Sequence, residues 1–506
     1  MLQRLKRLGA GLLLCALLSG LAAAPASAAG FQDVPAGHWA AESIRRCADL
    51  GFIQGESATR FGLGEPMTRA AFAVALCRFF GWETETVTAS TFSDVPADAW
   101  YAGAVEAAYT HGAVTDQRAD FRPEEALTRE ELAVMLVRAL GYGTIAGLAQ
   151  DLTLPFTDVT TNLGYLTMAY DLGLMGGTSD TAFSPDAEAP REQVAVILMR
   201  LYDRLYGQAP ETVALVSAPA EGETLPDLAA LGAAAIPAGR LIGVGGTALV
   251  SAAIPAETAA AMRDAAREAG AQALLYVEGG PTALDAGTRE AAEVLVQAVT
   301  AGDYDGLVLD MPKLGRADRK ALTQLAKALD KALGDAELCL IVEAPAWQGK
   351  TYEGYDYAGL AQSADRLVAR IGSYEAAGEG FPTAPVNPLE EVYYALATLR
   401  DEAGAEKLTI LLDTAPTVWD DSGRQHALPA EELAALLETG QRHYSSRYAC
   451  AYVNGTGEDG QALAAWFLDR QAVAERILLL RSFGVDQLWL TDWGADVQAL
   501  LEAPET

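Results

Sequence analysis

The segment Tyr304–Pro312 reads Y-D-G-L-V-L-D-M-P, and it decides the fold of the second half of the chain. A short apolar run, Leu307 to Leu309, lies between a glycine and an aspartate, and a long amphipathic helical pattern follows it. This pattern is typical of a buried strand in a parallel sheet. We therefore expect the strand to deliver Asp310 to its C-terminal end, where parallel barrels place their functional side chains.

Similar apolar runs alternate with helical patterns through the rest of this half. There are eight of them, at 213–217, 241–244, 273–277, 307–310, 338–342, 366–371, 408–412 and 487–490. Eight strands that alternate with helices fit a parallel (β/α)8 barrel, also called a TIM barrel. We therefore predict an α/β barrel at residues 213–506, after a linker at 207–212.

The first half of the chain repeats a pattern with a period near sixty residues. Each copy opens on an F-x-D-V element, at Phe31, Phe92 and Phe156, and each later carries an Arg that begins a helical pattern, at Arg69, Arg129 and Arg191. Three copies at matched offsets predict an all-α bundle of three similar units. We place the units at residues 30–88, 89–150 and 151–206.

These copies resemble S-layer homology (SLH) domains, in which F-x-D-V, Trp and T-R-x-E recur in this order. The resemblance implies binding to secondary cell-wall polysaccharide, which would attach an exported protein to the wall or S-layer of a bacterium. It assigns the polysaccharide site to six residues, Trp39, Arg69, Trp100, Arg129, Glu131 and Arg191. The second copy keeps both the Trp and the Glu, whereas Ala71 and Gln193 replace the Glu in the other copies.

The chemistry of these side chains allows two interpretations. An arginine fork binds a carboxylate through two hydrogen bonds, and an aromatic ring beside it stacks on a sugar, so the set suits an anionic glycan. The alternative is structural, because an Arg in the first turn of a helix also forms a local ion pair and a Trp at a helix start also packs.

The segment Tyr304–Pro312 is itself similar to the signature strand of glycoside hydrolase family 18, D-G-x-D-x-D-x-E. Asp305, Gly306 and Asp310 match that pattern. Val308 replaces the middle Asp, and Pro312 replaces the Glu that acts as the general acid. The motif therefore indicates the fold of the family, but it lacks the general acid that hydrolysis by this family requires.

The family 18 resemblance implies substrate-assisted hydrolysis of an N-acetylglucosamine-containing glycan such as peptidoglycan or chitin. Asp310 would orient the acetamide group of the substrate, and Tyr374 would support it. Other glycan contacts are implied for five residues, Asp305, Glu375, Trp419, Trp489 and Trp493. Because Pro312 has no proton to donate, the rate would fall by about two to four orders of magnitude without a replacement acid.

Another carboxyl at the mouth of the barrel is the alternative source of that proton. Glu343 is the best candidate, because its strand is the neighbour of the strand that carries Asp310, and a carboxyl beside another carboxylate holds its proton more tightly. The competing interpretation is that such residues cap the helices that follow the strands. This leaves two hypotheses, a wall-anchored glycan-binding barrel without catalysis and an active hydrolase that uses a relocated acid.

Composition limits the partners. The net charge is −32, and it becomes −35 if residues 1–29, which have the three parts of a signal peptide, are removed. A surface this acidic argues against nucleic acid and anionic lipid as partners, and no later segment has the length of apolar chain that crosses a membrane. Neither the five cysteines nor the four histidines have metal-ligand spacing, so we predict no metal and no cofactor.

Overall fold

The structure is a computed structural model that describes residues 31–149, 154–220, 222–345, 352–371, 385, 387–419, 425–456, 460 and 462–501. The chain divides into two compact units, and the boundary lies between Gly207 and Gln208. No helix in the described ranges has both the length and the apolar character needed to span a bilayer.

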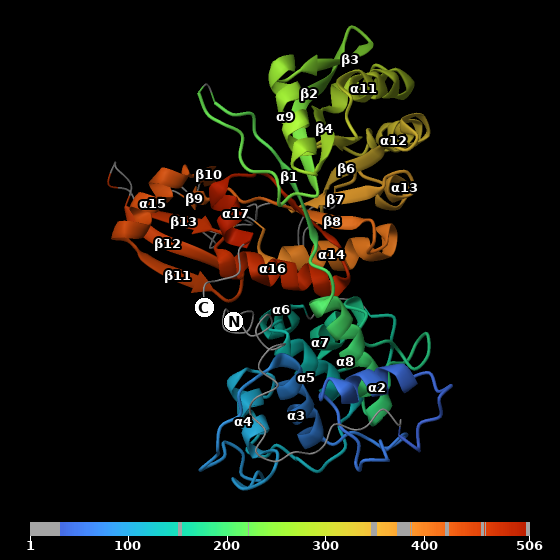
Figure 1. Cartoon of the computed structure of the whole chain (residues 1–506), viewed down its shortest axis with the longest axis vertical. Helices are drawn as coiled ribbons and strands as arrows, with labels where there is room; N and C mark the ends of the chain where they lie inside the picture. Colours follow the sequence, from blue (N-terminus) through green and yellow to red (C-terminus); the bar gives the residue numbers. More distant parts are fainter. Residues whose placement is uncertain are drawn as a thin grey trace. The chain divides into compact units, whose positions relative to one another are not determined.

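The first unit is helical, as predicted. Each repeat contributes one helix before its Phe-containing loop and one after it, and the short helix α6 follows these two helices in the second repeat (Figure 1). The helices are α2 (Ala41–Asp49), α3 (Arg69–Phe80), α4 (Ala102–Thr110), α5 (Arg129–Ala139), α6 (Gly143–Leu148), α7 (Leu163–Asp171) and α8 (Arg191–Tyr206).

A closed ring of backbone hydrogen bonds joins the three repeats. The amide of Leu127 donates to the carbonyl of Met67 at 2.8 Å, the amide of Ala189 donates to Leu127 at 2.8 Å, and the amide of Met67 donates to Ala189 at 2.9 Å. All three side chains are buried. Because the third repeat bonds back to the first, each repeat is hydrogen-bonded to both of the others at this ring. The unit is therefore a threefold bundle.

The F-x-D-V elements explain the local fold of each repeat. The carboxylates of Asp33, Asp94 and Asp158 accept hydrogen bonds from the backbone amides of Phe61, Phe121 and Phe183, at 2.7 to 2.8 Å. The three Phe rings are buried. The Asp therefore ties the start of each repeat to the loop before its second helix, and this requirement fixes the spacing seen in the sequence.

The second unit contains a closed barrel of eight parallel strands, which confirms the prediction. The strands pair in the order β1-β14-β8-β7-β6-β5-β4-β2, and β1 also pairs with β2. They are β1 (Glu211–Leu215), β2 (Ala233–Val244), β4 (Gln272–Gly279), β5 (Gly306–Asp310), β6 (Glu337–Glu343), β7 (Arg366–Arg370), β8 (Leu408–Leu412) and β14 (Gln487–Leu490). The segment that decided the prediction is thus β5, which is buried along its whole length.

Helices follow the strands and lie outside the barrel, as Figure 1 shows for α11, α12 and α13. They are α9 (Ala256–Glu268), α10 (Pro281–Leu284), α11 (Thr288–Gly302), α12 (Arg319–Leu333), α13 (Tyr357–Ala361), α14 (Leu389–Ala403), α16 (Arg470–Phe483) and α17 (Ala495–Leu501).

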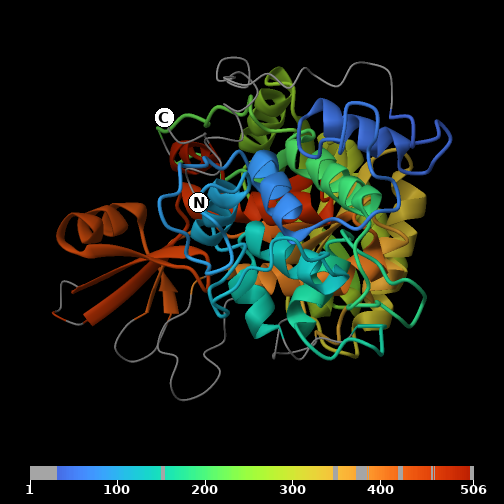
Figure 2. The same ribbon diagram turned by 90° about the horizontal axis from the view of Figure 1, so that it is seen from below.

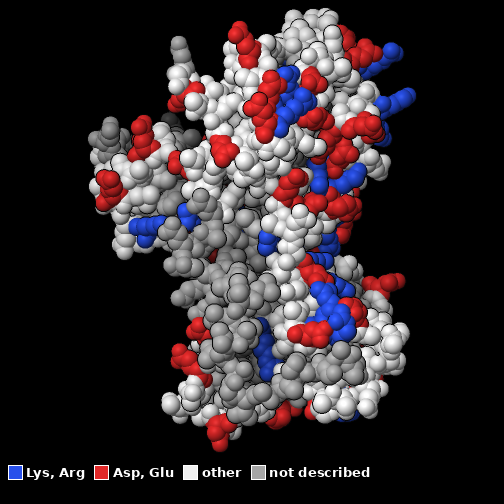
Figure 3. All heavy atoms as spheres, in the orientation of Figure 1, with Lys and Arg blue, Asp and Glu red and all other residues white. Residues whose placement is uncertain are grey.

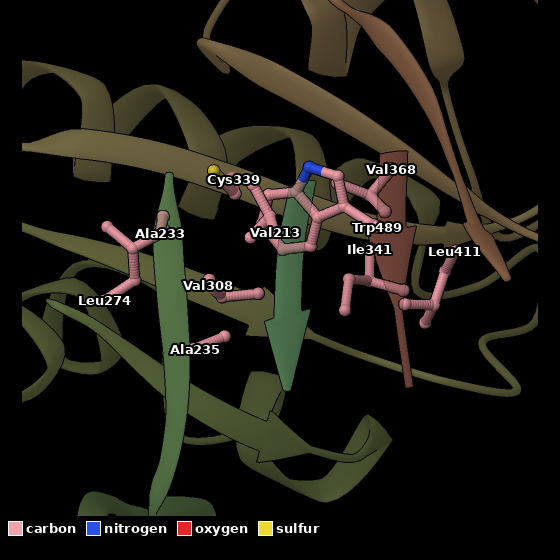
Figure 4. Close-up of a cluster of buried hydrophobic side chains, with 10 residues drawn as sticks. All are labelled: Val213, Ala233, Ala235, Leu274, Val308, Cys339, Ile341, Val368, Leu411 and Trp489. Carbon is pink, nitrogen blue, oxygen red and sulfur yellow. The ribbon is translucent and has the colours of Figure 1, made fainter. Parts of the chain in front are cut away.

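Side chains fill the interior of the barrel, so it is a packed core (Figure 4). Val308 from β5, Ile341 from β6, Val368 from β7 and Trp489 from β14 all point into this core and are almost fully buried. Val308 stands where the family 18 motif has its middle Asp. At that position the chain has an apolar packing residue. The carboxylate that the motif would place two residues before Asp310 is therefore absent.

One strand begins earlier than predicted. The run at 241–244 is the outer half of β2, whereas the part that closes the barrel against β1 is Ala233–Ala235. The outer half continues into a hairpin with β3 (Thr247–Ala252). Alanine has a low strand propensity, so the sequence pattern gave no strand signal at 233–235, and packing inside the barrel decides the conformation there.

A small antiparallel sheet was not predicted. It lies between β8 and α16 in the sequence, and its strands pair in the order β10-β9-β13-β12-β11. Figure 2 shows these strands beside the barrel, with α15 (Ala430–Thr439) on one face. The strands are β9 (Thr417–Trp419), β10 (Gln425–Ala427), β11 (Gln441–Ser445), β12 (Cys450–Thr456) and β13 (Ala462–Phe467).

The aspartate ties of the helical unit predict a pH-dependent stability. Hydrogen bonds from the amides of Phe183 and Ser184 lower the pKa of Asp158 below its ordinary value. A group whose pKa is lower in the folded state stabilises the fold above its unfolded pKa, and this stabilisation disappears as the pH falls through the folded pKa. We expect Asp158→Asn to unfold at a lower urea concentration than the parent chain at pH 7, with the difference shrinking towards pH 3.

Asp180→Asn is the control, because Asp180 is exposed in the same repeat. Urea midpoints of the three chains, measured between pH 7 and pH 3, test the prediction. A difference for Asp158→Asn that stays constant over this range would show that the carboxylate charge does not hold the loop.

Candidate functional site

Three charged side chains meet at the C-terminal ends of three neighbouring barrel strands. Asp310 ends β5, Glu343 ends β6 and Arg370 ends β7. One guanidinium nitrogen of Arg370 lies 3.1 Å from Asp310 Oδ1 and 3.1 Å from Glu343 Oε1, and the other contacts Asp310 Oδ2. Asp310 is 1% exposed and Glu343 is 9% exposed. The arginine therefore bridges the two carboxylates that the sequence placed at the barrel mouth.

Tyr276 of β4 completes the surroundings of Asp310. Its hydroxyl donates to Asp310 Oδ2 at 2.6 Å. Burial raises the pKa of Tyr276, and the nearby charge of Asp310 raises it further, so the phenol stays neutral and keeps donating. Both oxygens of Asp310 thus have partners within the protein.

The charge state of Arg370 follows from its two neighbours. Burial lowers the pKa of Arg370, but hydrogen bonds and charge from Asp310 and Glu343 outweigh burial and raise the pKa above its ordinary value. Glu343 therefore lies near Asp310, as predicted, and its Oε1 accepts a hydrogen bond from Arg370 at 3.1 Å. To reach a leaving oxygen, Glu343 would have to break this contact.

Tyrosine hydroxyls hold the backbone at the ends of two of these strands. Tyr355 donates to the carbonyl of Met311 at 2.7 Å, and Tyr357 donates to the carbonyl of Glu343 at 2.8 Å. Pro312, at the position of the family's general acid, lies in the turn that follows β5. The loop that carries Tyr355 and Tyr357 thus fixes the strand ends around the Asp310–Arg370–Glu343 cluster.

The three tryptophans predicted to contact glycan are buried. Trp489 is a core residue with 0% exposure, and its indole donates to Gln487 Oε1 at 3.0 Å. The indole of Trp493 donates to the carbonyl of Asp227 at 2.7 Å, and Trp419 lies in β9 of the small sheet. The prediction for Trp489 is wrong, because strand alternation turns its side chain into the closed barrel. Trp493 and Trp419, at 3% and 4% exposure, also present no open ring face for a sugar.

Asp305 lies at the wrong end of the barrel for a glycan contact. It precedes β5, whereas Asp310 ends that strand. Its carboxylate accepts a hydrogen bond from the amide of Ala273 at 2.8 Å and pairs with Arg267 at 2.9 Å. The prediction of a glycan contact is therefore wrong for Asp305, which links β4, β5 and α9 at the N-terminal end of the barrel. Tyr374 and Glu375 lie outside the described residues, so their roles stay predictions.

Sequence reasoning missed Arg370 and Tyr276. The only signal for Arg370 was a charged residue at the end of an otherwise apolar run, 366–371. Tyr276 looked like one more apolar residue of a strand. Their importance depends on the register, which pairs Tyr276 with Val308 and Glu343 with Arg370, and this register is a property of the assembled sheet.

In the helical unit, each motif arginine belongs to an interface between repeats. Arg69 of repeat one donates through Nε to the carbonyl of Phe121 in repeat two at 2.7 Å, and its guanidinium carbon lies 4.9 Å from the centre of the Phe121 ring. In the same way, Nε of Arg129 donates to the carbonyl of Phe183 at 3.0 Å, and Nε of Arg191 donates to the carbonyl of Phe61 at 2.9 Å. These arginines therefore make structural contacts between repeats, and their role in binding polysaccharide stays a prediction.

Glu131 contacts residues of both the first repeat and its own repeat. Its carboxylate pairs with Arg69 at 2.7 Å, and it forms a capping box with Thr128. Burial raises the pKa of Glu131, but Arg69, the amide of Thr128 and Arg122 outweigh this and lower it. The most complete set of motif residues is thus shared between repeats one and two, where Arg69, Glu131 and Arg122 line a cavity of about 280 Å³.

Trp39 and Trp100 are the motif residues that remain open to solvent. Their exposures are 64% and 69%, which is unusual for such large apolar side chains. Each stands next to the start of the first helix of its repeat. An open indole face is the feature that a stacking contact with a sugar ring requires.

Comparison with known families agrees with the repeats. The profile of the S-layer homology domain matches residues 30–73, 91–133 and 155–195. Relatives over this part include S-layer protein EA1 of Bacillus anthracis, 30% identical over 217 residues, or 42% of this chain and 24% of the relative. An endoglucanase of Bacillus sp. (strain KSM-635) is 33% identical over 181 residues, or 34% of this chain and 18% of the relative.

Residues 30–195 are thus three S-layer homology domains. The chain is a surface protein attached to the cell wall or S-layer. It spans only about a tenth to a quarter of the length of the curated relatives that it matches.

Solved structures also resemble the chain. The spore cortex-lytic enzyme SleL of Bacillus cereus has a TM-score of 0.49 at 15% identity, covering 58% of this chain and 74% of that chain. A chitinase of Chromobacterium violaceum has a TM-score of 0.49 at 18% identity, covering 58% and 99%.

The cluster at the barrel mouth predicts a large effect of removing its cation. Arg370→Met would leave Asp310 and Glu343 as two buried carboxylates without a counter-charge, at a cost of about 3–5 kcal/mol in unfolding free energy at pH 7. Calorimetry of the full chain at pH 7, following the transition of the barrel, measures this loss.

Arg366→Met is the matched control at the other end of β7. Arg366 pairs with the largely exposed Asp486, so its loss should cost only about 1 kcal/mol. Adding Asp310→Asn and Glu343→Gln to Arg370→Met should restore most of the stability. If Arg370→Met alone is as stable as the parent chain, the cluster does not stabilise the barrel mouth.

Proposed function

We propose that this surface protein is anchored to secondary cell-wall polysaccharide by its S-layer homology domains and carries a barrel that binds an N-acetylglucosamine-containing glycan without cleaving it. The observation that carries the second part is the pairing of Arg370 with both Asp310 and Glu343. In a family 18 hydrolase the residue at the position of Pro312 would deliver the proton. Here that position has no proton, and Glu343, the nearest predicted replacement, is bonded to Arg370.

A hydrolase with this barrel mouth would lack a proton donor for the leaving group. Cleavage of a glycosidic bond needs a proton at the leaving oxygen in the transition state, whereas binding uses contacts that already exist in the ground state. Arg370 bonds Glu343 at 3.1 Å and keeps its carboxyl engaged, and Pro312 offers no alternative proton donor. Binding without turnover is the outcome that this arrangement favours.

Support for glycan binding comes from the polar groups that remain. The side chain of Arg370 is 28% exposed and has donors beyond those used by the two carboxylates, so it can bond a hydroxyl or an acetamide oxygen. The family 18 resemblance of β5 supplies the class of glycan. The competing function, an active hydrolase, would need Glu343 to leave Arg370 when substrate binds.

Turnover separates the two functions. We expect the full chain to release no sugar from chito-oligosaccharides or peptidoglycan above the level of a heat-inactivated sample, while binding the same glycans in calorimetric titrations. Asp310→Asn should weaken that binding, because it changes the group that orients Arg370 and Tyr276. Reducing-end release resolved by chromatography measures turnover.

Glu343→Gln is the informative comparison for this experiment. If the parent chain releases sugar at ordinary enzyme rates and Glu343→Gln abolishes the release, Glu343 is a working acid and the barrel is a glycosidase. Pro312→Glu combined with Val308→Asp rebuilds the family motif and tests whether the missing acid is the sole defect.

Anchoring is tested with the two open tryptophans. We expect the chain to sediment with purified cell-wall sacculi and to lose this when the polysaccharide is stripped. Trp39→Ala and Trp100→Ala should each reduce the bound fraction severalfold, because a stacking contact contributes about 1 kcal/mol or more. Leu50→Ala is the control, since Leu50 is an exposed apolar residue of the same unit. Equal binding to intact and stripped walls would contradict anchoring through the polysaccharide.

A further inference from the structure

A cluster of positive charges lies on α12 and in the loop that precedes it. Four of the seven lysines of the chain lie between residues 313 and 331, together with two arginines. These six cations accompany only two carboxylates, so the segment has a net charge of +4 in a chain of net charge −32. The residues are Lys313, Arg316, Arg319, Lys320, Lys327 and Lys331, and we call this set the α12 basic stripe.

The spacing places three lysines of the stripe on one side of α12. Lys320, Lys327 and Lys331 follow one another at intervals of seven and four residues, which is the spacing of a single helix face. The opposite face packs on the barrel through Leu322, Leu325 and Leu329. From Lys320 to Lys331 the row is about 16 Å long at 1.5 Å per residue. Figure 3 shows Lys and Arg side chains projecting along the edge of the barrel that carries α11 to α13.

The surface beside the stripe is hollowed. A groove of about 450 Å³ is lined by Arg316, Arg319, Lys320, Lys327, Thr323, Gln324 and Asp356. Asp356 pairs with Arg319 at 3.4 Å. Among the described residues, the four lysines of the stripe form no ion pair. The charges of these lysines are therefore available to an external anion.

The composition of this surface points to a polyanionic chain and away from a protein partner. Protein interfaces are enriched in aromatic residues and Met and depleted of Lys. The large apolar side chains that are exposed among the described residues all lie outside α12 and its preceding loop. Lysines are flexible point charges that tolerate variable positions of the anionic groups, which suits a polymer with repeated charges.

We propose that the α12 basic stripe binds a polymer that carries carboxylate or phosphate groups at intervals, and that it gives the barrel a contact with the surrounding wall that is separate from the S-layer homology domains and from the barrel mouth. Two contacts on one chain raise the retention of the protein through effective concentration. Because the rest of the surface is acidic, the stripe also sets which side of the barrel such a polymer approaches.

Binding of soluble polymers to the full chain tests the proposal without sacculi and without any turnover. The probes are polygalacturonate, which carries carboxylates, and long-chain polyphosphate, with neutral dextran as the reference. We expect Lys320→Gln with Lys327→Gln to weaken binding of at least one anionic probe about tenfold at low salt. The same pair should reduce the slope of log K against log salt by about one to two. The probe that responds more strongly identifies the anionic group.

Two controls make the result specific. Lys320→Arg with Lys327→Arg keeps the charges and should keep the affinity, and Arg240→Gln removes an exposed cation of β2 outside the stripe and should have no effect. Equal affinity of the Lys→Gln pair and the parent chain overturns the proposal. So does sedimentation velocity that shows self-association of the parent chain lost in the Lys→Gln pair, because the stripe would then bind the acidic surface of a second copy.

Discussion

The guanidinium of Arg370, held between Asp310 and Glu343, is the interaction on which the properties of the barrel mouth depend. Three neighbouring strands each end in one member of the cluster, so the charges can balance only when the sheet is closed in its observed register. Bringing two carboxylates into a buried layer is costly without a cation, and the arginine offsets this cost. The same contacts with Arg370 occupy oxygens of both carboxylates.

The helical unit uses arginine in a related way. Each motif Arg leaves its own repeat and stacks on the Phe of another, and the sequence of contacts runs from repeat one to two, from two to three and from three to one. Together with the ring through Met67, Leu127 and Ala189, these contacts make the three repeats one cooperative body. The motif arginines, which in the sequence resemble ligand contacts, therefore also serve as packing contacts. Trp39 and Trp100 are the motif residues whose rings stay open to a sugar.

The sequence was sufficient for the parts of the fold that follow from periodicity. Eight apolar runs predicted the barrel, and three matched repeats predicted the bundle, because both patterns are local and repeated. The antiparallel sheet was not predicted because β9 and β10 have only three residues each and β13 is rich in alanine. Asp310 and Glu343 could be placed at the barrel mouth from strand ends alone. Arg370 and Tyr276 could not, since their contacts join strands that are distant in sequence and depend on register. Trp489 was misassigned because its inward direction is known only once β14 is fixed at Gln487–Leu490.

Charge distribution separates the chain into surfaces with different possible partners. The acidic surface favours solubility and repels polyanions, whereas α12 and the loop before it carry four of the seven lysines of the chain. The barrel mouth has its charges paired internally, so it suits neutral glycan better than an ionic ligand. In this account the anchoring repeats, the barrel mouth and the α12 basic stripe are three separate surfaces with three kinds of ligand.

The central claim is that the barrel mouth holds a glycan with no proton donor at the scissile bond. A crystal structure of the full chain soaked with a chito-oligosaccharide tests this claim most directly. The account predicts an intact oligosaccharide, with Arg370 still bonded to Asp310 and Glu343 and with no carboxyl within hydrogen-bond reach of a glycosidic oxygen. A cleaved oligosaccharide, or Glu343 turned away from Arg370 towards the glycosidic oxygen, would contradict it.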